Sequence, residues 1–333
     1  MNNTTDMDGE MISSEEIFLT LVVFVVTFVL GVVGNVLVFL VIFAKKERRT
    51  ANDIFLLNLA TADLLTVSVS LPLKLLLLVA PYLPLNCFVC KILYPMMTVP
   101  YCASIFTITS MAIQRRTAIL NPWKGVMSHG WTLACVAAIW LLSSILTVPL
   151  SVFSNVQSGS CSLNWSQEQQ KIYVVSIFFI QYSLPLTIII IAYVQICLNL
   201  KKYQKNIVRQ EIRKENIEIT RTIAVIVVLF AVFTLPLQVF WLLFVYQLET
   251  VGFETIAKLH HYAELLTDFH SCLNPLVYGA LTRRFRRKYT LLFTSVFKLF
   301  ERPQKDVRSC NGASTGGKND HECIRLKQRS RTV

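Results

Sequence analysis

The chain alternates long apolar tracts with short polar segments over its 333 residues. A helix needs about 20 mainly apolar residues to cross the ~30 Å hydrocarbon core of a bilayer. Within lipid, every backbone amide must pair inside its own segment, which favours helices. Seven tracts are long enough, and they cover residues 17–44, 54–79, 88–113, 131–153, 172–200, 222–246 and 255–281. The pattern therefore predicts an all-α integral membrane protein, built as a seven-transmembrane helix bundle.

The seventh tract is the most polar of the set, since it contains His260, His261, Glu264, Asp268 and His270. Ionisable groups inside a membrane-spanning helix normally face the bundle interior or a cavity. We therefore predict that this tract also spans the membrane and that its polar face points inward.

The composition agrees with a chain that meets lipid, because 54% of the residues are hydrophobic, 16% are charged and the mean hydropathy is +0.53. A net charge of +12 also occurs in nucleic-acid-binding proteins. Here, however, the basic residues lie between apolar tracts, where they face anionic lipid headgroups. The predicted partner of this charge is the lipid bilayer and not a nucleic acid.

Lys and Arg are concentrated on one side of the predicted membrane. They follow the first, third, fifth and seventh tracts, whereas residues 1–16, 80–87 and 154–170 contain none. Because positively charged loops stay in the cytoplasm, we predict an extracellular N-terminus, a cytoplasmic C-terminus and a plasma-membrane location. The glycosylation sequons of the extracellular side begin at Asn2, Asn3 and Asn164.

The predicted organisation has four parts. Residues 1–16 form an extracellular tail and residues 17–281 form the bundle. Residues 282–292 form a short amphipathic cytoplasmic helix, and residues 293–333 form a disordered cytoplasmic tail. The amphipathic helix is predicted because Phe285 is flanked by basic residues, a pattern typical of helices that lie in the membrane interface.

The tracts also carry a set of spaced polar, aromatic and proline residues. The set comprises Gly34-Asn35-Val36, Leu59-Ala60-Thr61-Ala62-Asp63, Trp140, Pro185 with Tyr193, Phe230 with Pro236, and Asn274-Pro275-Leu276-Val277-Tyr278. Over residues 17–292 this set resembles the rhodopsin-like (class A) G-protein-coupled receptors, most of all the neuropeptide receptors. The resemblance implies an extracellular ligand and, as intracellular partners, a heterotrimeric G protein and arrestin.

By resemblance, one group of residues transmits the signal to the G protein. It comprises Arg115, Tyr193, Phe230, Pro236, Asn274, Pro275 and Tyr278. The prolines remove backbone hydrogen bonds and so weaken their helices locally, which suits helices that bend between two states.

Two positions depart from the family pattern. The family usually has an acid before Arg115 and a tryptophan two residues before Pro236, whereas this chain has Gln114 and Thr234 there. A neutral amide holds an arginine less firmly than a carboxylate does. We therefore expect a raised basal activity.

Asp63 is a carboxylate in the middle of an apolar helix, which is costly unless the charge is paired or neutralised. By resemblance, it forms an oxygen-lined pocket with Ser104, Ser271 and Asn274 that holds an allosteric sodium ion. The alternative is a structural aspartate that is protonated or held by hydrogen bonds. We predict no other metal and no other cofactor.

Cys90 lies 25 residues before Arg115, where the family has the cysteine that ties its third helix to the second extracellular loop. Cys161 is the only cysteine in that loop. The resemblance therefore implies a Cys90–Cys161 disulfide, with Cys87 as the competing partner. The extracellular compartment is oxidising and permits the bond.

Two residues that other ligand classes require are absent from the matching positions of this chain, and their absence narrows the class of ligand. The third tract has no acid to pair with an amine ligand, since Met97 stands at the matching position. The seventh has Asp268 where opsins have the Lys of their Schiff base. On that tract, His260, Glu264 and Asp268 recur at i, i+4 and i+8, so they share one helix face.

The predicted ligand site gathers polar and aromatic side chains from four tracts. Its members are Lys74, Met97, Tyr101, Gln238, Trp241, His260, Glu264 and Asp268. Two acids in such a cavity suit a small cationic or amidated neuropeptide. In the alternative interpretation, Lys74 simply pairs with Glu264. A receptor for a non-peptide ligand such as a lipid also stays open.

Other classes of protein fit the sequence less well. A seven-helix transporter would show internal repeats with helices broken at matched positions, and the prolines fall at unmatched positions. An enzyme would need a nucleophile beside a base, or metal-ligand spacing. The sequence shows neither arrangement, so we predict no enzymatic activity.

Overall fold

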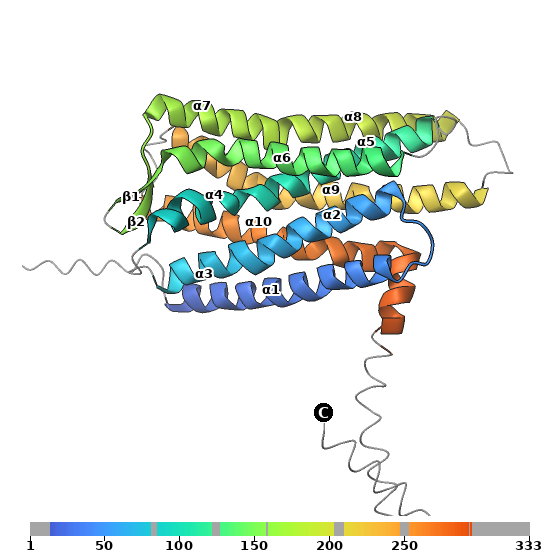
Figure 1. The fold of residues 1–333 in the computed structure, drawn as a ribbon, viewed down its shortest axis with the longest axis horizontal. Helices are drawn as coiled ribbons and strands as arrows, with labels where there is room; N and C mark the ends of the chain where they lie inside the picture. The colour runs from blue at the N-terminus through green and yellow to red at the C-terminus, as the bar shows by residue number, and fades with distance from the viewer. Residues whose placement is uncertain are drawn as a thin grey trace, which may run out of the picture. The chain divides into compact units, whose positions relative to one another are not determined.

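The computed structural model describes residues 14–80, 85–121, 127–157, 159–202, 210–246, 253–292 and 294. Seven helical segments run side by side (Figure 1). They are α1 (Ser14–Phe43); α2, η1 and α3 (Ala51–Leu65, Thr66–Ser70, Leu71–Val79); η2, α4 and α5 (Val89–Leu93, Tyr94–Met96, Thr98–Leu120); α6 (His129–Phe153); α7, η4 and α8 (Gln167–Phe178, Phe179–Ser183, Leu184–Lys202); α9 (Gln210–Val245); and α10 (Phe253–Leu281). The predicted seven-helix bundle is confirmed.

Six of these segments are long and apolar enough to cross a membrane by length and composition. The seventh, α10, is the polar tract already noted. Large apolar side chains are exposed on the outside of the bundle, among them Phe18 at 69%, Leu141 at 64% and Val228 at 60%. A water-soluble protein rarely exposes so much apolar surface. The chain is a multi-pass membrane protein whose exposed apolar side chains face lipid.

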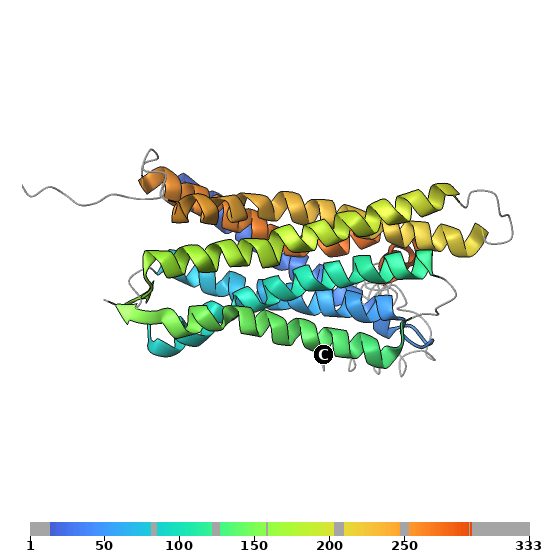
Figure 2. The ribbon, with the colours of Figure 1, turned by 90° about the horizontal axis from the view of Figure 1, so that it is seen from above.

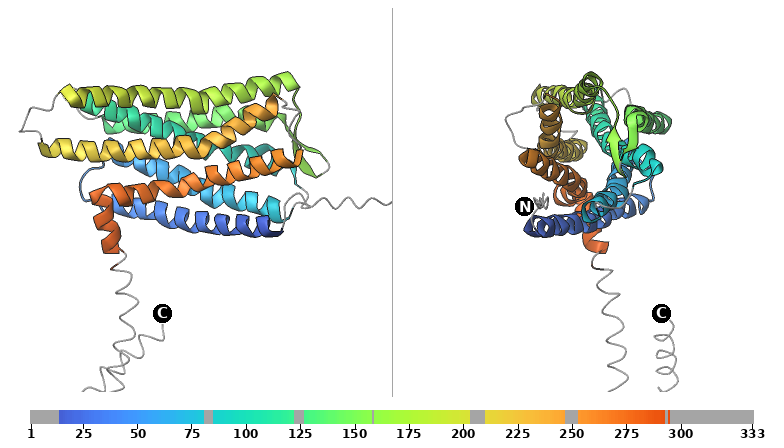
Figure 3. Two further views of the ribbon diagram at one scale, coloured as in Figure 1. Left: turned by 180° about the vertical axis from the view of Figure 1, so that it is seen from behind. Right: turned by 90° about the vertical axis from the view of Figure 1, so that its left-hand side faces the viewer.

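The third segment forms the centre of the bundle. In the most apolar 18-residue stretch of this segment 61% of the residues are buried, against 17% in the corresponding stretch of α6. Its helix α5 packs against α2, α6, α8 and α9. Seen end-on in Figure 3, the helices surround a common interior, and α5 contacts four of the other helices there.

Two short strands mark one end of the bundle. β1 (Ser154–Gln157) and β2 (Ser160–Leu163) pair antiparallel, with Val156 opposite Cys161. Gly159 in their turn has a φ of 80°, a conformation that favours glycine. We call the end that carries the two strands the hairpin end and the other the opposite end (Figures 1 and 2).

A disulfide joins Cys90 in η2 to Cys161 in β2. This is the pairing that the resemblance implied, and the competing Cys87 is an exposed free thiol. The backbone N–H of Leu85 also donates to the carbonyl of Gly159 at 2.8 Å. The hairpin is thus held against the start of the third segment.

The Gly34-Asn35 pair allows α1 to approach α10 closely. A Cβ atom on Gly34 would lie 2.8 Å from the Cβ of Pro275, too close for a side chain. Asn35 Nδ2 donates to the carbonyl oxygens of Gly31 at 3.0 Å and Ser271 at 3.2 Å. Small residues and buried hydrogen bonds are what hold helices together within lipid.

Asn58 connects three helices through its side-chain amide. Trp140 Nε1 donates to Asn58 Oδ1 at 2.8 Å, and Asn58 Nδ2 donates to Thr107 Oγ1 at 2.7 Å. Trp140 is half-buried, and a tryptophan taken out of water normally finds such a partner for its N–H. The tryptophan of the motif set therefore ties α6 to α2 and, through the amide, to α5.

Several helices are longer than the apolar tracts predicted. α9 begins at Gln210 rather than at position 222, and α5 continues to Leu120 rather than ending at 113. The tracts mark only the part that crosses hydrocarbon. The start of α2 at Ala51 follows from a capping box formed by Thr50 and Asp53.

Residues 283–292 are helical, as predicted for the eighth helix. Within this helix the rings of Phe285 and Tyr289 lie one turn apart, with centroids separated by 5.9 Å. Arg283 and Arg286 are exposed, so the helix is amphipathic. The predicted features that lie outside the described residues are the sequons at Asn2 and Asn3, most of the tail 1–16 and nearly all of the tail 293–333.

A candidate ligand cavity within the bundle

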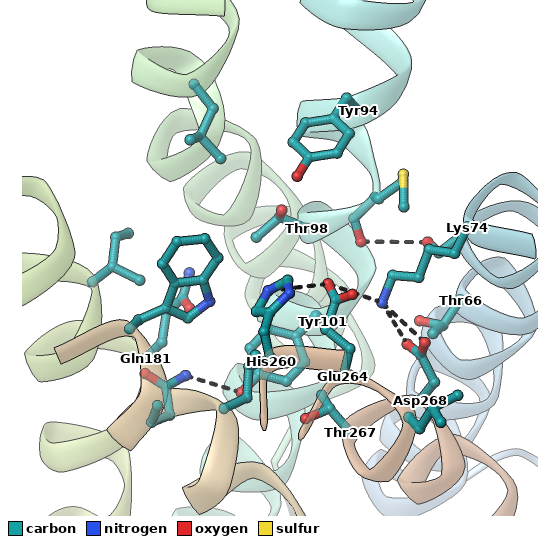
Figure 4. A pocket seen from close by; sticks show the side chains of 18 of the residues that line it. Thr66, Lys74, Tyr94, Thr98, Tyr101, Gln181, His260, Glu264, Thr267 and Asp268 are labelled. Atoms are coloured by element: carbon teal, nitrogen blue, oxygen red, sulfur yellow. Dashed lines mark hydrogen bonds and ion pairs between the residues drawn. The ribbon is translucent and has the colours of Figure 1, made fainter. Parts of the chain in front are cut away.

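A cavity of about 490 Å³ lies among the helices, and its lining reaches Leu163 and Trp165 beside the hairpin. All eight side chains predicted for the ligand site line it, namely Lys74, Met97, Tyr101, Gln238, Trp241, His260, Glu264 and Asp268. Figure 4 shows how the charged members converge from α3 and α10. The volume is within the range of about 300–1,000 Å³ that is usual for small-ligand sites.

Lys74 forms the central ion pair of the cavity. Its Nζ lies 2.9 and 3.1 Å from the two carboxylate oxygens of Asp268, and 3.7 Å from Oε1 of Glu264. Asp268 is 5% exposed, whereas the side chain of Glu264 is 32% exposed. The alternative pairing of Lys74 with Glu264 is therefore only partly right, because Asp268 is the closer partner.

The charges that line the cavity do not cancel. Among the described lining residues, one ammonium (Lys74) and two carboxylates (Glu264 and Asp268) sum to a net charge of −1. Lys74 satisfies Asp268 with two short hydrogen bonds. Glu264 keeps the longer contact, with Nε2 of His260 at 3.8 Å on its other side. Glu264 is thus the carboxylate best placed to receive a cation.

Aromatic and amide side chains form the wall on the α9 side. Gln238 Nε2 donates to the hydroxyl of Tyr101 at 3.2 Å, which links α9 to α5 across the cavity. The ring of His260 packs against Phe240 and Trp241, with centroid separations of 4.6 and 5.3 Å. This wall offers both apolar contact and hydrogen bonds to a bound group.

Much of the lining was not predicted, including the polar and aromatic side chains of Tyr94, Trp165, Tyr173, Gln181 and His270. Helical spacing could have found Tyr94, which lies three residues before Met97 and so shares its face. No local pattern could have found Trp165. It follows β2 and packs on Phe153 and Tyr173, with centroids 5.3 and 5.0 Å away, an arrangement set by tertiary packing.

Asp63 is 1% exposed and accepts two side-chain hydrogen bonds. Ser104 Oγ donates at 3.0 Å and Asn274 Nδ2 at 2.7 Å. Ser271 lines the nearby cavity, without a hydrogen bond to Asp63 in the described part of the chain. Asn274 Oδ1 is buried with no partner among the described residues. A carboxylate, hydroxyls and an amide oxygen are the donors that hard cations prefer, so these residues fit a sodium ion.

Phe230 lines the cavity from near the middle of α9. It is 1% exposed, and its ring has centroid separations of 6.3 Å from Tyr182 and 5.8 Å from His270. Pro236 lies inside the same helix, six residues further on. Phe230 therefore connects the cavity-lining face of α10 to α9, the helix that carries the predicted hinge at Pro236.

The other predicted transmission residues continue toward the opposite end. Tyr193 donates its hydroxyl to the carbonyl of Thr220 at 3.2 Å, which joins α8 to α9. Arg115 and Tyr278 are 5% and 2% exposed. Pro275 lies inside α10, three residues before Tyr278. Arg115, Pro275 and Tyr278 are buried between the helices, and Tyr193 is half-buried.

The departure at Gln114 has a structural consequence. Its side-chain oxygen is buried with no hydrogen-bond partner among the described residues. Two residues further on, Arg116 donates from Nε to Oε1 of Gln195 and so joins α5 to α8. The amide therefore occupies the position of the usual acid without an observed bond of its own.

The seven-helix bundle, the disulfide and the Asp63 network together define a class of receptor. The sequence model of the 7 transmembrane receptors of the rhodopsin family matches residues 34–278. The chain belongs to this family of G-protein-coupled receptors, and it is not an enzyme.

Similar proteins of this family come from several vertebrates. The chain is 30% identical over 292 residues to galanin receptor type 1 of Homo sapiens, covering 84% of this chain and 82% of that protein. It is 28% identical to neuropeptide Y receptor type 6 of Mus musculus over 305 residues, covering 83% and 80%. It is 27% identical to somatostatin receptor type 2 of Mus musculus over 301 residues, covering 86% and 79%.

Proposed function

We propose that this receptor lies in the plasma membrane with its hairpin end outside the cell, and that an extracellular peptide binds in the cavity. The excess of Lys and Arg in the segments of the opposite end supports this orientation. The similar receptors are named for galanin, neuropeptide Y and somatostatin, which are peptides. A cavity lined by aromatic, amide and charged groups suits a peptide ligand as well.

The observation that carries the proposal further is the incompletely compensated charge of Glu264, which shares Lys74 with Asp268 at the longer distance of 3.7 Å. Lys74 is engaged by Asp268, and the described lining has a net charge of −1. A ligand with one cationic group, such as an Arg or Lys side chain or a free amine, would restore neutrality. A hydrogen bond between such charged groups contributes about 1.5–3 kcal/mol.

Only part of a peptide enters the cavity. A volume of about 490 Å³ takes a group of drug size, so the remainder of the peptide would lie over the hairpin end. Trp165 and Leu163 connect the lining to β2. The hairpin would therefore contact the part of the peptide that remains outside.

The response follows from differential binding. A peptide that binds the active bundle more tightly than the inactive one shifts the population toward the active state. Arg115, Tyr193 and Tyr278 would then engage the heterotrimeric G protein at the opposite end, and arrestin would bind the same face. Asp63, Ser104, Ser271 and Asn274 would hold an allosteric sodium ion, which would neutralise the buried carboxylate in the inactive bundle.

The test is a signalling reporter that accepts several G-protein types, applied to a panel of cationic and amidated peptides including galanin, neuropeptide Y and somatostatin. The variant is Glu264→Gln. The matched control is Glu168→Gln, which makes the same chemical change in an exposed helix α7 residue outside the cavity lining. We expect Glu264→Gln to raise the half-maximal concentration of an active cationic peptide about 10- to 100-fold, and Glu168→Gln to leave it unchanged.

Two outcomes would contradict the proposal in different ways. If an active peptide responds equally to both variants, Glu264 is not its partner. If no peptide acts, but Arg115→Ala abolishes a ligand-independent signal, the protein still signals as a receptor. Its ligand is then a lipid or another non-peptide molecule.

A further inference from the structure

The cavity continues below its charged cluster. Its lower lining, which we call the deep end, consists of Ser104, Phe230, His270 and Ser271. At 1.5 Å of rise per residue, His270 lies about 9 Å along α10 from Glu264. Phe230 likewise lies about 12 Å along α9 from Gln238. The cavity therefore spans roughly two helical turns beneath Glu264.

The small side chain at position 234 leaves this depth open. Phe230, Thr234 and Gln238 recur at i, i+4 and i+8 and so share one face of α9. Thr234 is completely buried, and its hydroxyl donates back to the carbonyl of Phe230 at 2.8 Å. The Thr234 side chain thus stays against the backbone of α9, and Thr234 is not among the described residues that line the cavity. A large aromatic side chain at this position would fill the space between the other two.

His270 is the polar group of the deep end that lacks a partner. It is 4% exposed, and its Nε2 is buried with no hydrogen-bond partner among the described residues. Its ring meets Phe230 edge to face, at 75° and 5.8 Å. Buried polar atoms in native proteins are nearly always hydrogen-bonded, so a ligand group that bonds to this nitrogen would gain affinity.

The chemistry of the deep end selects an uncharged group. None of its four residues carries an ammonium or a carboxylate. The nearest carboxylate, Asp63, already accepts hydrogen bonds from Ser104 and Asn274. Ser104 and Ser271 also belong to the proposed sodium site, in which the ion would already neutralise Asp63. A charged ligand group would therefore lose its hydration here without gaining a counter-charge of its own, whereas a hydroxyl or amide would lose much less.

We propose that the deep end is a second subsite, in which His270 binds an uncharged hydrogen-bonding group of the ligand, a hydroxyl or an amide, beside the ring of Phe230. This inference rests on the proposed function, since it takes the cavity as the ligand site. The ligand then has two recognition elements, a cation at Glu264 and a neutral polar group about 9 Å deeper. The second element contacts Phe230 and thereby α9.

The test uses three probes of one shape: benzyl alcohol, toluene and benzylammonium. Each is titrated against the purified full-length receptor, and the rise in the unfolding temperature reports binding. His270→Phe keeps an aromatic ring against Phe230 and removes the hydrogen bond. His270→Asn keeps a hydrogen-bonding side chain and serves if His270→Phe does not fold. Glu264→Gln tests the cation site separately.

We expect benzyl alcohol to bind wild type about fivefold more tightly than toluene. His270→Phe should abolish that preference, and His270→Asn should retain part of it. Benzylammonium binding should depend on Glu264 and not on His270. Any of three results would overturn the subsite. In the first, wild type binds benzyl alcohol no more tightly than toluene. In the second, His270→Phe keeps the preference for benzyl alcohol, and in the third this variant weakens the binding of both probes equally. Loss of the Glu264 dependence alone would instead count against the proposed cation site.

Discussion

Lys74→Gln removes the only ammonium that lines the cavity in the described part of the chain, and it leaves two carboxylates without their cation. The energetic cost is largest at Asp268, because this carboxylate is 5% exposed and loses two hydrogen bonds of 2.9 and 3.1 Å. Asp268→Asn should cost less. In that variant Lys74 still has Glu264, whose Oε1 lies 3.7 Å away.

The magnitude follows from the burial of the pair. Breaking a buried ion pair by removing one partner costs about 3–5 kcal/mol. The side chain of Lys74 is 21% exposed to the cavity, so water screens part of the interaction, and we take about 2 kcal/mol for Lys74→Gln. A large domain loses about 2 °C in unfolding temperature per kcal/mol, which predicts a fall of about 4 °C.

The assay is thermal unfolding of the purified receptor in one detergent, for wild type, both single variants and the double variant Lys74→Gln/Asp268→Asn. The double variant removes both charges, so it should recover most of the loss, as replacement of a whole buried pair often does. Equal losses for the two single variants, or a double variant less stable than Lys74→Gln, would refute the reasoning.

Three further predictions test separate features. Gly34→Ala places a methyl group 2.8 Å from the α10 proline and should lower the unfolding temperature, whereas Gly130→Ala, whose Cβ meets nothing within 4 Å, should not; equal temperatures would contradict the close α1–α10 packing. Sodium chloride, compared with choline chloride at the same ionic strength, should raise the unfolding temperature of wild type but not of Asp63→Asn, and equal shifts would remove the sodium proposal. Gln114→Asp should lower ligand-independent signalling in the G-protein reporter, because a carboxylate pairs with Arg115 more strongly than an amide does; an unchanged signal would show that the amide does not raise basal activity.

The helical architecture was predictable because the hydrocarbon core dictates the length of each apolar tract. The polar face of α10 was predictable for a related reason, since buried ionisable groups must point into the bundle. His260, Glu264 and Asp268 therefore entered the ligand site from their spacing alone, and the structure places all three in the cavity lining.

Pairing within the cavity was not predictable to the same degree. Both acids lie on one helix face, and the choice of Lys74 between them depends on how α3 approaches α10. The deep end illustrates a second limit. The small residue Thr234 was visible in the sequence. The depth that it opens, and the nitrogen of His270 that has no partner there among the described residues, depend on how α5, α9 and α10 pack together.

The most direct test of the central claim is a reciprocal exchange of charge at position 264. An active cationic peptide from the reporter screen is compared with an analogue in which its cationic residue is replaced by Glu, on wild type and on Glu264→Lys. We predict that Glu264→Lys loses most of its response to the cationic peptide and responds to the acidic analogue better than wild type does. A Glu264→Lys receptor that reaches the cell surface, keeps its Arg115-dependent signalling and still prefers the cationic peptide would contradict the account.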